Sequence, residues 1–231
     1  MSASSGLPPM ARVGAALTPQ HWWTALQRAW NLRRLATPEY RFLFAPPPPD
    51  EWIALDCETT GLNVRTDEII SIGAVRIVGQ RIMTSERLEL LIKPERGVSA
   101  ESVKIHRLRA RDLAAGLPAR EAIEKLLHFI GSRPVVGYYL EFDIAMLNRL
   151  ARPLLGQGLP QPRIEVSGMY YDYQFQHRTA SEQYENPEID LRFSTMMKTL
   201  QLPAREAHDA LNDAVMAALA FIKLKHLSES R

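Results

Sequence analysis

Three strand-like runs that follow one another between residues 52 and 92 limit the possible folds more than any other part of this sequence. The first, Trp52 to Leu55, is short and continuously apolar and ends in Asp56, which is typical of a buried central strand. The other two, 68–78 and 87–92, alternate apolar and polar residues, so each has one apolar side. Together the three runs predict an antiparallel meander.

Helical and strand-like patterns alternate in the remainder of the chain. We expect helices at 120–130, 142–150, 193–200 and 209–227, strands at 135–138 and near Val166, and a loop rich in proline and glycine at 153–163. A meander followed by alternating helices and strands predicts an α/β fold, in which a mixed sheet is flanked by helices.

The first 50 residues differ from the rest. Thr18-Pro19 is typical of a helix start, and we expect a helix over 18–35 that carries Trp23 and Trp30 on one face. The run Pro46 to Pro49 predicts a semi-rigid spacer. We therefore divide the chain into an N-terminal extension, residues 1–50, and a main domain, residues 51–231.

The charge of the chain is unevenly distributed. The net charge of +2 does not by itself mark a nucleic-acid-binding protein. The extension carries five arginines and two acidic residues, whereas the main domain is nearly neutral. This basic, aromatic segment is compatible with a docking site for a protein partner at residues 18–49, and equally with a helix that packs against its own domain.

Several features bear on the compartment. No apolar run is long enough for a transmembrane segment, and the N-terminus lacks the pattern of a secretory signal. The single cysteine, Cys57, has no partner within the chain, which suits a reducing compartment. We therefore expect a cytoplasmic protein.

Asp56 and Glu58 form the first acidic group of interest. Residues i and i+2 of a strand point to the same side, so the two carboxylates project together. Such close carboxylates repel each other unless a cation binds between them or one is protonated, and their hard oxygen atoms suit magnesium or manganese. Taken alone, such a triplet is a solvated acidic turn in the great majority of proteins. The following Thr59-Thr60-Gly61 offers backbone amides to a phosphate or a sugar.

Two later acids precede or begin predicted helices. Asp143 lies at a helix start, where the dipole favours an acid, although a capping role is the commoner reason for such a residue. Asp213 shares a face with Ala217 and Ala220, which lets its helix approach the sheet, and an acid on such a face is costly unless paired or metal-bound. His208 precedes that helix and can take a proton from water, although a lone histidine is more often a surface residue.

The order of these motifs resembles the DEDDh family of 3′–5′ exonucleases, which includes the proofreading epsilon subunit of bacterial DNA polymerase III, ribonuclease T and oligoribonuclease. The matching stretches are LDCETTGL at 55–62, Phe142-Asp143 and HDALNDA at 208–214, with Ile105-His106 as a further element. The resemblance covers about residues 51–225.

The resemblance implies a ribonuclease H-like fold and a two-metal-ion hydrolysis that releases nucleoside 5′-monophosphates from the 3′ end of a strand. It implies two divalent ions, Mg²⁺ or Mn²⁺, held by Asp56, Glu58, Asp143 and Asp213, with His208 as the general base. The residues that it implies for substrate binding are Thr59, Thr60, Gly61, Leu62, His106 and Phe142. Single-stranded DNA is the favoured substrate, and RNA stays open.

Two positions depart from the family pattern without removing a metal ligand. Tyr138-Tyr139 stands where relatives often carry His-Asn, and Arg107 follows His106 where relatives often carry glycine. Two alternatives to a DNA exonuclease remain at this point. One is an RNA exonuclease similar to ribonuclease T or oligoribonuclease, and the other is a catalytically silent module that binds nucleic acid or a partner. Magnesium-dependent activity that requires Asp213 would exclude the silent module.

Overall fold

A computed structural model describes residues 28–179, 188–203 and 209–230. The elements in chain order are η1 (Pro38–Phe44), β1 (Glu51–Thr59), β2 (Ile69–Val78), β3 (Arg81–Leu91), α2 (Ala100–His106), α3 (Ala110–Leu113), α4 (Ala119–Ile130), β4 (Val135–Gly137), α5 (Leu140–Leu155), β5 (Arg163–Glu165), α6 (Val166–Gln176), α8 (Phe193–Thr199) and α9 (Ala210–Glu229). The strands form one sheet in the order β3-β2-β1-β4-β5. Strands β1, β2 and β3 pair antiparallel, and β4 and β5 add parallel to β1. The predicted meander and mixed sheet are confirmed.

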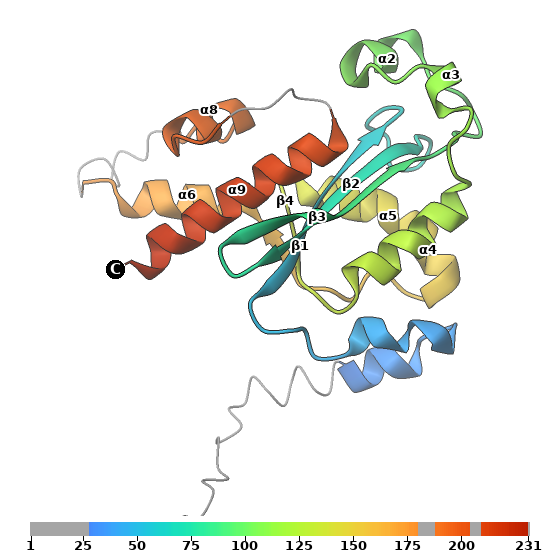
Figure 1. The fold of residues 1–231 in the computed structure, drawn as a ribbon, viewed down its shortest axis with the longest axis horizontal. Helices are drawn as coiled ribbons and strands as arrows, with labels where there is room; N and C mark the ends of the chain where they lie inside the picture. Colours follow the sequence, from blue (N-terminus) through green and yellow to red (C-terminus); the bar gives the residue numbers. More distant parts are fainter. Residues whose placement is uncertain (1–27, 180–187, 204–208, 231) are drawn as a thin grey trace, which may run out of the picture.

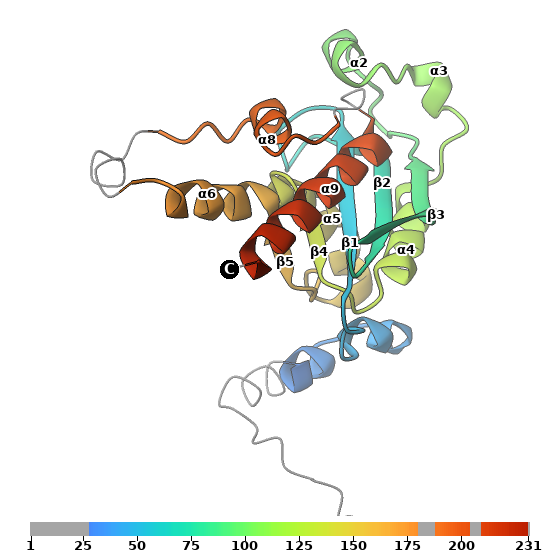
Figure 2. The same cartoon turned by 60° about the vertical axis from the view of Figure 1, so that its left-hand side comes forward.

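Helices cover both faces of the sheet (Figures 1 and 2). Helix α9 crosses one face, with α6 and α8 beside it, and α4 and α5 lie on the other. Alternate residues of β1 follow this division, because Ile53 and Leu55 join the core on the α5 side whereas Ala54 joins the core under α9. Trp52 also faces α9, with its ring 5.1 Å from that of Phe221. Asp56 and Glu58 are the next two residues of β1 on the face that α9 covers.

Strand β2 differs from the one-sided pattern expected for 68–78. Most of its side chains are buried, because helices cover the strand from both sides and β1 and β3 flank it. Ile72 and Ala74 pack in one core, and Val75 and Ile77 pack in the other. The alternation in the sequence therefore marks two buried faces here, and not one buried and one exposed face.

Two boundaries are corrected by the structure. Helix α5 continues through Pro153 to Leu155, where we expect a loop. Proline lacks one backbone N–H, so the helix loses one hydrogen bond there and ends two residues later. Near Val166 we expect a strand, but the strand is β5 and Val166 begins helix α6. The sequence does not predict α6, because its apolar residues are spread around the helix and do not form one stripe.

The described part of the N-terminal extension contacts the main domain. Residues 28–33 are helical, within the helix expected over 18–35, and the rest of that helix up to residue 27 lies outside the described residues. In η1, Tyr40, Leu43 and Phe44 are buried in the same core as β1. The domain boundary at residue 50 stays a prediction. Among the described residues, no helix is long and apolar enough to cross a membrane.

Candidate active site

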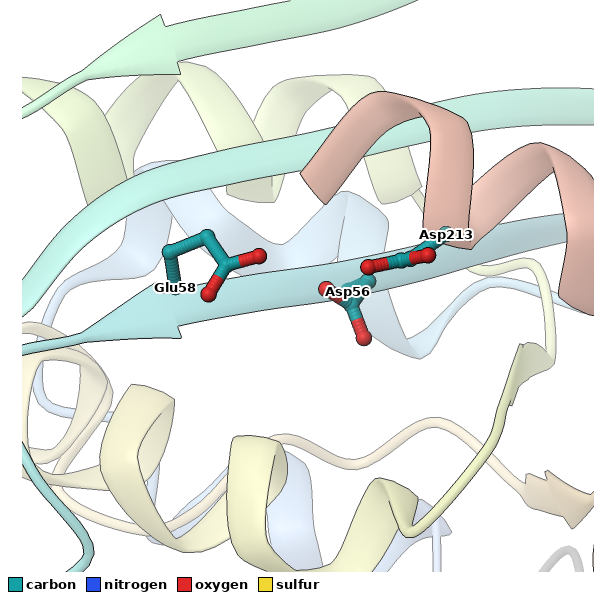
Figure 3. A group of neighbouring side chains, drawn as sticks. All are labelled: Asp56, Glu58 and Asp213. Atoms are coloured by element: carbon teal, nitrogen blue, oxygen red, sulfur yellow. The ribbon is translucent and has the colours of Figure 1, made fainter. Parts of the chain in front are cut away.

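Three carboxylates from two elements meet at the carboxyl-terminal half of β1. Asp56 and Glu58 project from β1 towards the start of α9, where Asp213 lies in the first turn (Figure 3). One carboxylate oxygen from each lies within 4.8 Å of the others, a spacing that can hold a metal ion. The strand extends to Thr59, so both acids of β1 belong to a paired strand and are held more rigidly than in the acidic turn considered above.

A glycine lets α9 approach the sheet at this point. Gly73 of β2 is the register partner of Asp56. A Cβ on Gly73 would lie 2.2 Å from the backbone carbon of Ala210 and 2.2 Å from the backbone nitrogen of Leu211. Only a residue without a side chain fits there. The first turn of α9, and Asp213 with it, therefore sits as close to β2 as the backbones permit.

Asp143 approaches the cluster from α5. It lies in the first turn of that helix and is 5% exposed, which is rare for an aspartate. It does not belong to the group of three whose oxygens lie within 4.8 Å of one another. It lines the same cavity as Asp56 and Glu58, and its charge acts on Asp56.

The electrostatics of the cluster favour a bound cation. Burial raises the pKa of Asp56 well above its ordinary value, and the charges of Asp143 and Asp213 raise it further. Burial, with Asp213 and Asp209, raises the pKa of Glu58 from 4.5 to about 7. For Asp143, burial and the charge of Glu58 raise the pKa, and a hydrogen bond from the backbone of Cys57 lowers it. Among the described residues, no cationic side chain contributes to these shifts. A bound cation would offset the repulsion between the carboxylates.

An open cavity of about 590 Å³ lies in front of the carboxylates. All six residues that the resemblance implies for substrate binding line it: Thr59, Thr60, Gly61, Leu62, His106 and Phe142. Leu62 is 85% exposed, whereas Phe142 is partly buried against the core. Tyr138, Tyr139, Ser99 and Ser102 also line the cavity, although the sequence does not single out the two serines.

His106 lies in the cavity lining but is 4% exposed and hydrogen-bonded through both ring nitrogens. Its Nδ1 accepts from the backbone N–H of Leu108 at 3.0 Å. Its Nε2 pairs with the Ser102 hydroxyl, which contacts the carbonyl oxygen of Thr59. Residues four apart lie on one helix face, so the spacing of Ser102 and His106 is a signal that the sequence already contains. The pair joins α2 to the end of β1.

The remaining predicted residue, His208, lies outside the described residues. Asp209, which follows it, is the N-cap of α9, and its side chain accepts from the backbone N–H of Asn212 at 2.8 Å. Arg107 has a φ of 60° at the end of α2, a left-handed conformation that favours glycine and accounts for the glycine common at this position in relatives.

Comparison with known proteins gives three informative matches. A model of the RNase T family, described as exonuclease, matches residues 53–221. The PolC-type DNA polymerase III of Thermotoga maritima is 26% identical over 183 residues, which are 71% of this chain and 13% of that protein. The DNA polymerase III epsilon subunit of Aquifex aeolicus is 24% identical over 176 residues, which are 75% of this chain and 79% of that protein. The chain thus spans a small part of the first of these relatives.

A solved structure matches the fold. Exonuclease I of E. coli, in a zinc-bound complex with single-stranded DNA, superposes with a TM-score of 0.64 at 17% identity. The match covers 80% of this chain and 42% of exonuclease I. It confirms the ribonuclease H-like mixed sheet flanked by helices.

Proposed function

The chain belongs to the RNase T family of exonucleases, whose model matches residues 53–221, and on this basis we propose that it hydrolyses nucleic acid from the 3′ end and releases nucleoside 5′-monophosphates. The observation that carries the proposal is the group of Asp56, Glu58 and Asp213, of which Asp56 and Glu58 line an open cavity. Such closely spaced carboxylates repel one another unless a cation binds between them or one is protonated, so the group fits a cation site.

The four carboxylates, Asp56, Glu58, Asp143 and Asp213, would hold two divalent cations, Mg²⁺ or Mn²⁺. The donor set fits these ions, since it consists of hard oxygen atoms, and a bound cation offsets the repulsion that raises the pKa values. When bound, such ions polarise the phosphate and lower the pKa of an attacking water.

The residues of the chain itself supply proton transfer and positioning. His208 would take the proton of the attacking water as a neutral imidazole. In the sequence it directly precedes Asp209, the N-cap of α9, and Asp213 lies one helical turn after that cap. Thr59 to Leu62, His106 and Phe142 would seat the terminal nucleotide in the cavity.

DNA is the substrate that we propose, because the matched relatives are named as DNA polymerase III proteins and the solved structure holds single-stranded DNA. An RNA exonuclease would need a residue that reads the 2′-hydroxyl. We further propose that residues 18–49 contact a protein partner. Trp30, which is 62% exposed on the described end of this segment, supports that role.

The test uses the purified chain with 5′-labelled single-stranded DNA and RNA of equal sequence, in magnesium and in EDTA. A ladder that shortens from the 3′ end only with the metal is the expected result, with DNA degraded faster than RNA. A faster loss of RNA would replace the DNA assignment by the RNA alternative. Folded protein that cleaves neither strand with Mg²⁺ or Mn²⁺ would favour the silent binding module.

A further inference from the structure

Tyr139, which stands where relatives often carry asparagine, has an unusual backbone. Its φ is 51° and its ψ is 33°, in the left-handed region that bulky L residues rarely adopt. Asparagine tolerates this region far better than tyrosine does. Such outliers persist only where the surrounding structure enforces them, and they gather at functional sites.

Glu165, at the end of β5, holds this backbone in place. Its Oε1 accepts from the backbone N–H of Tyr139 at 3.1 Å, and its Oε2 accepts from that of Leu140 at 2.8 Å. The same Oε1 accepts from the backbone N–H of Ser167 at 3.1 Å and from its hydroxyl at 2.8 Å. One carboxylate thus caps the starts of both α5 and α6 and fixes the direction in which the Tyr139 side chain leaves the chain.

The ring of Tyr139 is exposed to solvent and contacts a neighbouring ring. It is 65% exposed and meets the ring of Tyr138 edge to face, with centroids 4.7 Å apart. Tyr138 is itself anchored, because its hydroxyl donates to the carbonyl oxygen of Leu191 at 3.0 Å and its ring packs 4.6 Å from that of Phe193. The contact with Tyr138 therefore supports the ring of Tyr139 without covering it.

Tyr139 borders two hollows of the surface. Tyr139 lines the cavity that holds Asp56 and also borders a second hollow over Ile189 and Leu191. Leu62 is the other large exposed apolar side chain in the cavity lining. Both apolar groups are within the lining, so a strand whose last nucleotide occupies the cavity can contact them.

We propose that Tyr139 is a stacking platform for the base of the penultimate nucleotide, on the 5′ side of the bond that is cut. This inference rests on the proposed exonuclease function. Every base has a π face, so such a platform holds strands of any sequence. Because Glu165 holds the backbone of Tyr139 and the ring of Tyr138 contacts its ring, less freedom is lost when a base stacks on it.

The test compares substrates with and without a penultimate base. The p-nitrophenyl ester of thymidine 5′-monophosphate fills the place of the terminal nucleotide alone. A single-stranded DNA oligonucleotide adds the penultimate base, and the same oligonucleotide with an abasic penultimate site removes it again. The variants are Tyr139→Asn, which keeps a residue suited to the left-handed backbone, and Tyr139→Phe, which keeps the ring. Tyr171→Asn is the control, because Tyr171 is 38% exposed on α6 and stacks on Phe175, away from the cavity.

The loss of one stack should raise the oligonucleotide KM of Tyr139→Asn by about 10-fold. The kcat, the hydrolysis of the ester and the KM for the abasic strand should stay near the wild-type values. Tyr139→Phe and Tyr171→Asn should resemble the wild type on all three substrates. The melting temperature of Tyr139→Asn should match or exceed that of the wild type, because the backbone strain is relieved.

Two results would overturn the inference. One is an unchanged oligonucleotide KM for Tyr139→Asn, and the other is an equal loss on the ester and on the abasic strand, which would mean that the residue shapes the cavity. If the wild type hydrolyses no substrate, the exonuclease proposal fails separately. Binding of a fluorescein-labelled oligonucleotide in EDTA then decides the role of Tyr139, since the stacking role requires weaker binding by Tyr139→Asn than by Tyr139→Phe.

Discussion

The replacement Gly73→Ala tests whether the approach of α9 to the sheet sets the geometry of the carboxylates. The new Cβ would lie 2.2 Å from backbone atoms of Ala210 and Leu211, whereas ordinary contact begins at 3.4 Å. Backbone cannot rotate away as a side chain can, so the first turn of α9 must retreat by about 1.2 Å. Asp213 lies in that turn and moves with it, away from Asp56 on the neighbouring strand.

A retreat of this size should lower kcat for oligonucleotide cleavage about 100-fold, because a misplacement of about 1 Å is known to have that effect in active sites. The strain of overpacking should also reduce the free energy of unfolding by about 1–3 kcal/mol. The measurements are single-turnover cleavage in saturating Mg²⁺, Mn²⁺ affinity and thermal melting. Cleavage is assayed well below the melting temperature, so that loss of folded protein does not imitate loss of chemistry.

Gly168→Ala is the matched control, because a Cβ at Gly168 in α6 meets no atom within 4 Å. It should leave cleavage unchanged and raise helix stability by up to about 1 kcal/mol. A Gly73→Ala variant that cleaves and binds Mn²⁺ as the wild type does would refute the reasoning, since α9 would then tolerate displacement without effect on the site.

The other predictions concern pH and the N-terminal extension. In EDTA, the raised pKa of Glu58 means that the folded state binds its proton more tightly than the unfolded state, so the contribution of Glu58 to stability is greatest below pH 4.5 and is lost as the pH rises to about 7. This loss of stability is at most roughly 3 kcal/mol. Melting curves at several pH values should show the loss in the wild type, a smaller loss in Glu58→Gln, and recovery of stability with Mg²⁺. A wild-type melting temperature that does not change with pH would contradict the role of Glu58. Deletion of residues 1–27 should leave oligonucleotide cleavage intact and weaken partner capture, and a loss of melting temperature would instead make the segment structural. Deletion of residues 1–45 should destabilise the fold by several kcal/mol, because it removes the buried Tyr40 and Phe44, and an unchanged melting temperature would show that η1 is dispensable.

Much of the site can be predicted from the sequence because its signals are local. The apolar run before Asp56 identifies a buried strand, and the spacing of Asp56 and Glu58 places both on one side of it. The small residues after Asp213 likewise predict a helix that lies close to the sheet, and Ala217 and Ala220 are buried as this requires. Periodicity and spacing are sufficient where one element determines the direction of a side chain.

Other features depend on contacts between distant segments, which no local pattern records. Gly73 resembles any glycine in a strand until the first turn of α9 is placed above it. Glu165 resembles an ordinary helix cap, and only the fold shows that it also holds Tyr139. Helix α6 is missed because its apolar residues do not share a face. The order of the acids, helices and strands can be predicted from the sequence, whereas the distances between packed helices and strands depend on tertiary contacts.

The central claim is that the carboxylates at the junction of β1 and α9 act as metal ligands in hydrolysis at a 3′ end. The most direct measurement compares wild type, Asp213→Asn and the control Asp172→Asn on 5′-labelled single-stranded DNA across a titration of Mg²⁺, with Mn²⁺ binding measured on the same samples. Asp172 is exposed on α6, so its replacement should change neither property. We predict a ladder from the 3′ end with wild type and control, and for Asp213→Asn weaker Mn²⁺ binding with a rate at least about 100-fold lower. An Asp213→Asn variant that binds Mn²⁺ and shortens the strand at the wild-type rate would contradict the account.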